Sequence, residues 1–161
     1  MSEKELKDKF KNAYMDVAVR FSQLSYAKRL QVGAIIVKEN RIISLGYNGT
    51  PAGWDNECEY EEEILVSELR KGTWVEKTGQ LKTKPEVLHA ERNALDKLAR
   101  CHESGNGASM FVTHSPCLEC AKSIFGAGIT HVYYKNDYRT DDGIKFLQKC
   151  GVIVEKINEE N

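Results

Sequence analysis

The sequence predicts an α/β domain in which helices cover both faces of one central, five-stranded mixed sheet, forming a three-layer α/β/α sandwich. Three observations support this prediction. A helical stripe of apolar residues opens the chain, a hairpin pattern follows, and helices and strands then alternate from residue 85 to the end. We expect the later strands to be parallel wherever helices connect them, because right-handed crossovers dominate such connections.

The first third of the chain predicts one helix and two strands. Apolar residues recur at three- and four-residue intervals from Leu6 to Leu24, which is typical of an amphipathic helix. Residues 32–37 form a continuous apolar run, and a short polar stretch separates it from residues 41–47. This pattern predicts a hairpin of two buried strands. The glycine- and proline-rich residues 46–51 then end regular structure.

Residues 55–85 show only a weak apolar periodicity, and we expect them to form an insert within a single domain that spans residues 1–161. The window 55–63, DNECEYEEE, holds six acidic residues and no basic one, whereas residues 70–84 hold five basic residues and one acidic one. A short helix around residues 61–70 is the element expected in this insert. The alternative is a solvated, charged surface.

Regular structure returns after Pro85. A helix is expected from residue 88 to about residue 100, followed by elements at residues 109–113 (strand), 116–126 (helix), 129–134 (strand), 142–149 (helix) and 152–157 (strand). Pro116 suits a first helical turn, and Gly128 suits the position after a helix end.

Length and composition exclude several classes of protein. The chain has 161 residues, 41% hydrophobic and 29% charged, so it can bury a core of its own. No apolar run approaches the roughly 18 residues that span a bilayer, and residues 1–11 lack a secretory pattern. The formal net charge of -1 offers no basic excess for a polyanion. We therefore expect a cytoplasmic protein that binds neither membranes nor long nucleic acids.

The cysteines and one histidine indicate a metal site. Five cysteines, an odd number in a chain without an export signal, favour reduced thiols and metal ligands over disulfides. Cys117 and Cys120 lie three residues apart on a predicted first helical turn, so their thiols can share a metal ion. His89 can supply a third ligand if its helix starts at the same edge of the sheet. Three ligands leave one tetrahedral position of zinc open, as in catalytic sites.

Glu91 is the candidate acid-base residue. It is too close in sequence to His89 for a comfortable fourth ligand, but it can reach a water on the metal. Glu91 would move that water's proton to a ring nitrogen and then to departing ammonia. With Pro116 before the two cysteines, these residues match the zinc deaminase signature, H-x-E followed by P-C-x-x-C.

From about residue 14 to residue 154, the chain resembles the deoxycytidylate (dCMP) deaminases of the cytidine deaminase superfamily. The resemblance rests on this signature and on the segments RLQVGAIIV (29–37), GYNGTPAG (46–53), HAERNA (89–94) and SPCLECAK (115–122). The zinc signature specifies the superfamily. The GYNG segment and the long insert before His89 point to the dCMP branch.

The resemblance implies hydrolytic conversion of dCMP to dUMP and ammonia, which would supply dUMP for thymidylate synthesis. A zinc-activated water would attack C4 of the pyrimidine while Glu91 protonates N3. Some relatives carry a second, structural zinc, but Cys58 and His102 lack obvious partners, so we expect one zinc per chain. A homohexamer is also implied, activated by dCTP with Mg²⁺ and inhibited by dTTP.

Further site residues follow from the resemblance. Asn48 would hydrogen-bond the deoxyribose, while the backbone of Ala90 and the carbonyl or hydroxyl of Ser115 would hold the base. The regulatory nucleotide is expected near Asn48, Gly49 and Gly53. By residue type alone, however, an asparagine between two glycines is more typical of a turn.

Three more residues are assigned to the phosphate side of the substrate in the same way. Arg29 resembles an arginine that lies near the phosphate, and Tyr138 with Arg139 resembles a pair that closes over the substrate. Each of these assignments has a simpler alternative. Arg29 could pair with an acidic residue, and Tyr138 and Arg139 could be ordinary surface residues.

Other functions stay open at the level of sequence. The same chemistry could serve a nucleoside, guanine or tRNA adenosine, although the balanced charge argues against tRNA. A non-catalytic zinc-binding module would hold the metal without turnover. A thiol redox protein would instead use Cys117 and Cys120 without a bound metal.

Overall fold

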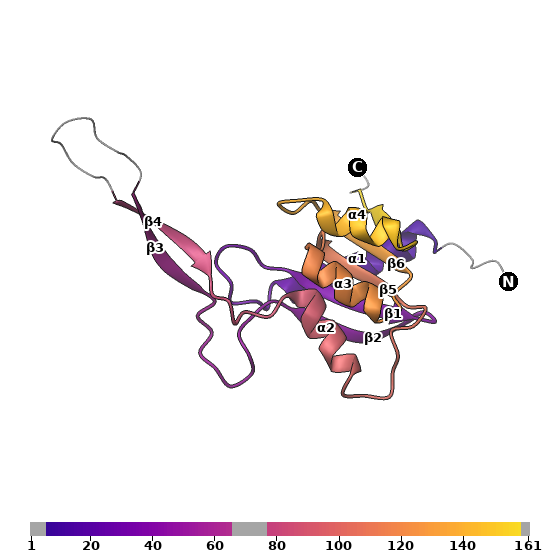
Figure 1. Ribbon diagram of the computed structural model, residues 1–161. Helices are drawn as coiled ribbons and strands as arrows, with labels where there is room; N and C mark the ends of the chain where they lie inside the picture. The colour runs from indigo at the N-terminus through magenta and orange to yellow at the C-terminus, as the bar shows by residue number, and fades with distance from the viewer. Residues whose placement is uncertain (1–5, 66–76, 159–161) are drawn as a thin grey trace.

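The computed structural model describes residues 6–65 and 77–158 (Figure 1). Within these ranges the central sheet consists of β1 (Gly33–Lys38), β2 (Arg41–Tyr47), β5 (Ser109–His114), β6 (His131–Asn136) and β7 (Ile153–Lys156). The helices are α1 (Asp8–Ser22), α2 (Ala90–Leu98), α3 (Leu118–Gly126) and α4 (Asp142–Lys149). A separate two-stranded ribbon pairs β3 (Glu59–Leu65) with β4 (Lys77–Thr83).

The central sheet is mixed, in the order β2-β1-β5-β6-β7. Strand β1 is antiparallel to both of its neighbours, β2 and β5. Strands β5, β6 and β7 are mutually parallel, and α3 and α4 connect them in sequence. The five-stranded mixed sheet and the parallel later strands are therefore confirmed.

Helices cover both faces of the sheet (Figure 1). Because successive side chains of a strand point to opposite faces, neighbouring residues of β1 and β5 enter two different cores. Ile35 and Phe111 pack with Met15 of α1 on one face. Ile36 and Met110 belong to the larger core on the other face, together with residues of α2, α3 and α4. This arrangement is the predicted three-layer sandwich.

The prediction of two buried hairpin strands is correct only for β1. Strand β1 is buried along almost its whole length, whereas β2 is an edge strand whose first residues, Arg41 and Ile42, are exposed. Helix α2 binds only the later part of β2, because Lys97 Nζ donates to the carbonyl of Leu45 and Asn93 Nδ2 to that of Tyr47. The start of β2 lies beyond this helix.

The helix expected around residues 61–70 is wrong for residues 61–65, which belong to β3; residues 66–70 lie outside the described ranges. Like charges one helical turn apart would repel each other along an acidic helix. In the ribbon the acidic strand instead pairs with a basic one, and Lys82 forms an ion pair with Glu62. The ribbon projects away from the sandwich as an arm (Figure 1).

Helix α1 is tied to the last strand by a charged contact. Lys11 is only 4% exposed, and its Nζ donates to both carboxylate oxygens of Glu155 at 3.0 and 2.9 Å.

Among the described residues, no helix has the length and apolar character needed to cross a membrane.

Candidate metal centre and active site

The starts of α2 and α3 meet at one edge of the sheet. Strands β2 and β5 are both antiparallel to β1, so they point the same way and end at the same edge. Helix α3 follows β5 directly, with Cys117 at its N-cap. Helix α2 follows β2 after the insert, with His89 at its N-cap. A bridge between Gly49 and Leu88 closes the insert just before His89.

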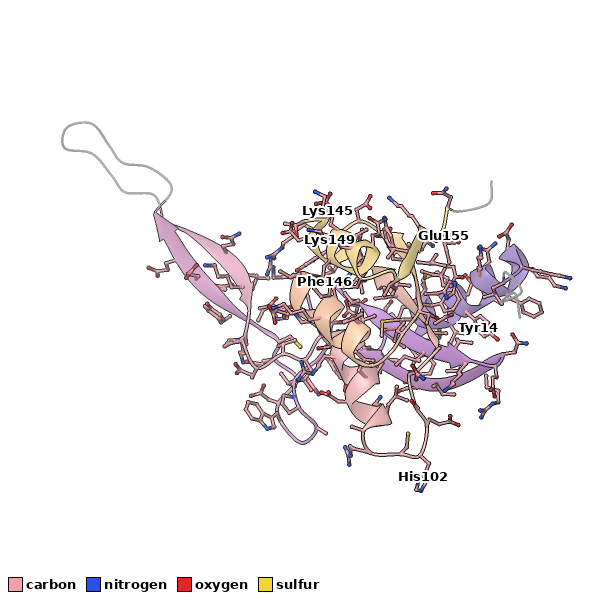
Figure 2. All side chains as sticks on the ribbon, turned by 45° about the vertical axis from the view of Figure 1, so that its right-hand side comes forward. Tyr14, His102, Lys145, Phe146, Lys149 and Glu155 are labelled. Atoms are coloured by element: carbon pink, nitrogen blue, oxygen red, sulfur yellow. The ribbon has the colours of Figure 1, made fainter. Side chains whose placement is uncertain are left out.

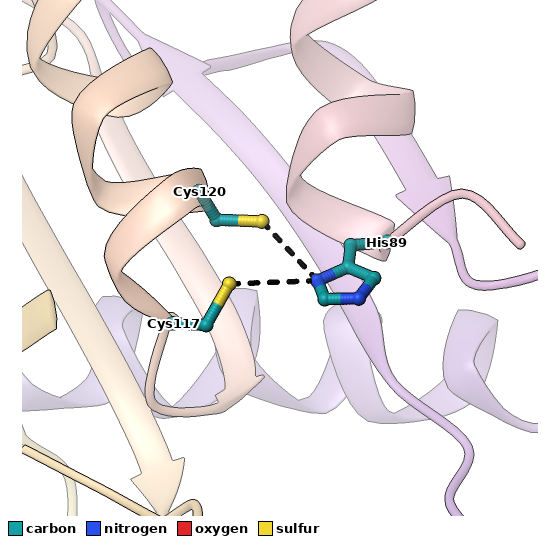
Figure 3. Close-up of side chains that lie close together, drawn as sticks. All are labelled: His89, Cys117 and Cys120. Carbon is teal, nitrogen blue, oxygen red and sulfur yellow. Dashed lines mark hydrogen bonds between the residues drawn. The ribbon is translucent and has the colours of Figure 1, made fainter. Parts of the chain in front are cut away.

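His89, Cys117 and Cys120 form a compact triplet (Figure 3). His89 Nδ1 lies 3.7 Å from Cys117 Sγ and 3.4 Å from Cys120 Sγ. Zinc bonds of about 2.3 Å to sulfur and about 2.0 Å to nitrogen, at tetrahedral angles, would place these atoms about 3.5 Å apart. The triplet therefore fits a tetrahedral zinc ion with three protein ligands.

The contacts within the triplet favour a thiolate at Cys117. Hydrogen bonds from Cys120 and His89 lower the pKa of the Cys117 thiol. The same contacts with Cys117 raise the pKa of Cys120 and of His89. A thiolate is thus favoured at the N-cap of α3, beside an imidazole nitrogen and a second sulfur, which are donor types that zinc binds.

Glu91 is a buried carboxyl group one residue inside α2. Glu91 is only 4% exposed, and burial raises the pKa of its carboxyl group to about 7. A group that gains and loses a proton near neutral pH is suited to general acid-base catalysis. Glu91 lines the same pocket as His89 and Cys117, whereas Cys120 is buried beneath them.

The pocket encloses about 250 Å³ at the sheet edge. His89, Glu91 and Cys117 line it. So do all six residues that the family resemblance assigned to the substrate: Arg29, Asn48, Ala90, Ser115, Tyr138 and Arg139. They come from the loop before β1, the ends of β2 and β5, the start of α2 and the loop after β6. Segments far apart in the sequence therefore converge on one cavity.

Two of these residues also organise the pocket wall. Asn48 Oδ1 accepts a hydrogen bond from the backbone N–H of Val32 at 2.8 Å, and its Nδ2 donates to the carbonyl of Leu30 at 2.8 Å. The buried Ser115 hydroxyl accepts a hydrogen bond from the backbone N–H of Tyr138 at 2.8 Å. Both polar side chains thus fix loops that face the cavity.

The glycines assigned to a regulatory nucleotide lie outside the lining of this pocket. The backbone N–H and C=O of Gly49 both bond to Leu88. Gly53 has a φ of +88° in an exposed turn, where the N–H of Trp54 donates to the carbonyl of Pro51. Glycine is favoured at Gly53 because side chains disfavour that backbone conformation.

Sequence reasoning missed other lining residues, including His114 and Thr83. His114 ends β5 three residues before Cys117, and burial lowers its pKa. Its place directly before the cysteine motif was the available signal. Thr83 ends β4, and nothing in the local sequence indicates that the insert returns to this pocket.

Within the described ranges, the triplet is the one group of three or more histidine, cysteine or acidic side chains that could hold a metal. Cys58 is buried in a small cluster with Ala27 and Val87. His102 is exposed in the turn after α2, where it points away from the body (Figure 2). These two residues do not meet each other in a second site.

Comparisons with known proteins agree with this geometry. Residues 8–136 match the family described as the cytidine and deoxycytidylate deaminase zinc-binding region. ComE operon protein 2 of Bacillus subtilis is 37% identical over 83% of this chain, which spans 63% of that relative. Deoxycytidylate deaminase of Enterobacteria phage T4 is 33% identical over 91% of this chain and 89% of its own.

A solved structure extends the likeness to three dimensions. The crystal structure of dCMP deaminase from the cyanophage S-TIM5, in complex with dCMP and dUMP, is 47% identical to this chain. The two agree with a TM-score of 0.79 over 95% of this chain and 100% of that one. From its matched family region, its fold and its relatives, the chain belongs to the cytidine and deoxycytidylate deaminase family of zinc-binding hydrolytic enzymes.

Proposed function

We propose that this protein catalyses the hydrolytic deamination of dCMP to dUMP and ammonia, and so supplies dUMP for thymidylate synthesis. The observation that carries the proposal is the buried Glu91 carboxyl, which lines one pocket with His89 and Cys117 of the metal-binding triplet. The choice of substrate is supported by the 47% identical cyanophage enzyme, whose structure contains dCMP and dUMP.

The metal chemistry belongs to His89, Cys117 and Cys120. A zinc ion held by His89 Nδ1 and the two Sγ atoms would act as a Lewis acid and make a water nucleophilic near neutral pH. Glu91 then handles the protons. It accepts one proton from the attacking water and passes it to N3 of the pyrimidine. It then carries the water's second proton, now on the new C4 hydroxyl, to the 4-amino group, which leaves as ammonia. The C4–N bond breaks and a C4–O bond replaces it.

Around this centre the chain offers groups for each part of the substrate. Ala90, at the start of α2, and Ser115 both line the pocket, where the backbone of Ala90 and the carbonyl or hydroxyl of Ser115 would hold the base. Asn48 would contact the deoxyribose. Arg29, Tyr138 and Arg139 also line the pocket, and the two arginines would supply positive charge to the phosphate.

The direct test is ammonia release from dCMP, deoxycytidine, guanine and a tRNA anticodon stem-loop, with zinc measured in the same preparation. We expect about one zinc per chain and fastest turnover of dCMP. Faster turnover of deoxycytidine than of dCMP would contradict the nucleotide preference. Stoichiometric zinc without turnover of any substrate would favour a non-catalytic zinc-binding module.

Regulation and assembly are part of the proposal. The same assay with dCTP and Mg²⁺, and with dTTP, tests activation and inhibition through the region of Asn48, Gly49 and Gly53. Sedimentation of the purified protein tests the homohexamer. The cytoplasmic location stays a prediction that cell fractionation can check.

A further inference from the structure

The foot of the β3–β4 arm is fixed to the pocket wall. Cys58, which precedes β3, is 1% exposed and packs with Ala27 and Val87. The backbone N–H of Lys84, which follows β4, donates to the carbonyl of Cys58 at 2.8 Å. Ala27 and Val87 also line the pocket. The two ends of the arm are therefore anchored at the site, although its strands project away from the sandwich (Figure 1).

One cross-strand residue pair of the arm contacts Arg29. Glu59 and Thr83 are directly opposite each other in the β3–β4 ladder. Glu59 Oε1 accepts hydrogen bonds from the backbone N–H groups of Lys28 at 2.8 Å and Arg29 at 3.1 Å. Thr83 Oγ1 accepts one from Arg29 Nη1 at 3.3 Å. This pair thus fixes both the main chain and the guanidinium group of Arg29.

Arg29 lies where the pocket meets an adjoining groove that is lined by several cations. Arg29 and Arg139 line both hollows, and Lys82 and Lys84 line the groove. No acidic side chain of the described residues is among those that line it. Within the same ranges Lys84 forms no ion pair. Lys82 pairs with Glu62, so Arg29, Arg139 and Lys84 are the cations available to attract an anion and bind it by charge-assisted hydrogen bonds.

We propose that Glu59 and Thr83 are positioning residues that hold Arg29 against the phosphate of the substrate, with Lys84 as a second cation at the groove. This inference rests on the proposed function and deepens it, because it makes the insert the element that selects a nucleoside monophosphate over a nucleoside. Glu59 holds the main chain of Arg29 and Thr83 holds its guanidinium group, so the side chain loses less conformational entropy when it binds phosphate oxygens.

Glu59 and Glu61 provide a matched pair of variants. Both lie on the same face of β3, but Glu61 is exposed and faces Leu81 across the ladder. We expect Glu59→Ala to raise KM for dCMP about tenfold, the scale of one lost charge-assisted hydrogen bond, with kcat within about twofold. Glu59→Gln keeps an acceptor oxygen and should have a smaller effect. Glu61→Ala should match the parent protein.

A binding measurement separates positioning from a merely structural role. Calorimetric titration of the zinc-loaded protein with dUMP and with deoxyuridine needs no turnover. Glu59→Ala and Thr83→Val should weaken dUMP binding and leave deoxyuridine binding unchanged. Equal weakening of both ligands, or identical behaviour of the Glu59→Ala and Glu61→Ala proteins, would overturn the inference. If Glu59→Ala fails to fold, Glu59→Gln and Thr83→Val carry the same comparison.

The two proposals can fail separately. If the parent protein does not deaminate dCMP but Glu59→Ala selectively weakens dUMP binding, the proposed reaction is wrong and the positioning role stands. If dCMP is deaminated and Glu59→Ala leaves its KM unchanged, the positioning role is wrong and the reaction stands.

Lys82→Met is a control for charge alone, because Glu62 already pairs with Lys82. Lys84→Met should weaken dUMP binding more than Lys82→Met, and the reverse order would refute the role of Lys84.

Discussion

Gly143 of α4 lies directly against the carbonyl oxygen of Pro116. A Cβ atom at position 143 would be 2.1 Å from that oxygen and 2.9 Å from the carbonyl carbon of Cys117. Helix α4 can therefore reach the metal-binding loop only because residue 143 has no side chain. The position of Cys117 depends on a helix that contributes no ligand of its own.

We expect Gly143→Ala to move Pro116 and Cys117, lowering zinc affinity and destabilising the protein by about 1–3 kcal/mol, the usual cost of overpacking. Competition with a chromogenic chelator measures the affinity, and thermal unfolding measures the stability. Gly126→Ala is the control, because no atom lies within 4 Å of its Cβ position. Similar losses in both variants would argue against a specific contact.

Glu91→Gln should keep its zinc and lose at least about a hundredfold in kcat, the usual scale for a missing general acid-base group. The amide has a similar shape but cannot shuttle a proton. Steady-state ammonia release and zinc content of the same sample provide the measurement. Glu119→Gln is the control, since that acid lies in the first turn of α3 but is 79% exposed at its side chain. If Glu91→Gln retained activity, the proposed role of Glu91 in proton transfer would be wrong.

Asn48→Asp should destabilise the protein by about 1–3 kcal/mol, because a carboxylate oxygen would replace the amide donor that faces the carbonyl of Leu30. The bond from the N–H of Val32 can survive in this variant. Asn48→Ala loses both bonds. Urea unfolding of the two variants should show that each is less stable than the parent protein. Unchanged stability in both would mean that Asn48 does not organise the loop.

Glu155→Gln should lower the free energy of unfolding by about 1–2 kcal/mol at pH 7, a modest value because the Glu155 side chain is 42% exposed. The hydrogen bond to Glu155 raises the pKa of Lys11 above 10.5 in the folded state. This stabilisation is therefore complete below pH 10.5 and is lost as the pH rises through the raised pKa. In denaturant unfolding, the difference in unfolding free energy between the two proteins should stay constant from pH 7 to about pH 10.5 and narrow only above that pH. A gap that disappears near neutral pH would contradict this assignment.

The sandwich could be predicted because its elements carry strong local patterns. The apolar stripe of α1 and the apolar runs of β1, β5 and β6 are each consistent with the cores that they enter. The ligand triplet was also predictable from sequence. His89, Cys117 and Cys120 lie at two helix starts, so knowing that those helices share one sheet edge is enough to bring them together.

The arm could not be predicted, because its stability depends on pairing between strands. An acidic segment such as residues 59–63 has little intrinsic preference for a strand, and its strand conformation depends on pairing with β4, a contact between segments distant in the sequence. The contacts of Glu59 and Thr83 with Arg29 could not be predicted from the sequence for the same reason. They join residues 30 and 54 positions apart, and no sequence periodicity reports them.

The bridge between Gly49 and Leu88 has a consequence for how this scaffold can change. The chain leaves and rejoins the sheet edge at adjacent points, so the size of the excursion between them hardly affects the remainder of the molecule. Insertions or deletions there would reshape the entrance while the helix starts stay in place. If the arm positions Arg29 as proposed, part of the ligand preference could diversify in this excursion while the metal-binding helix starts are preserved.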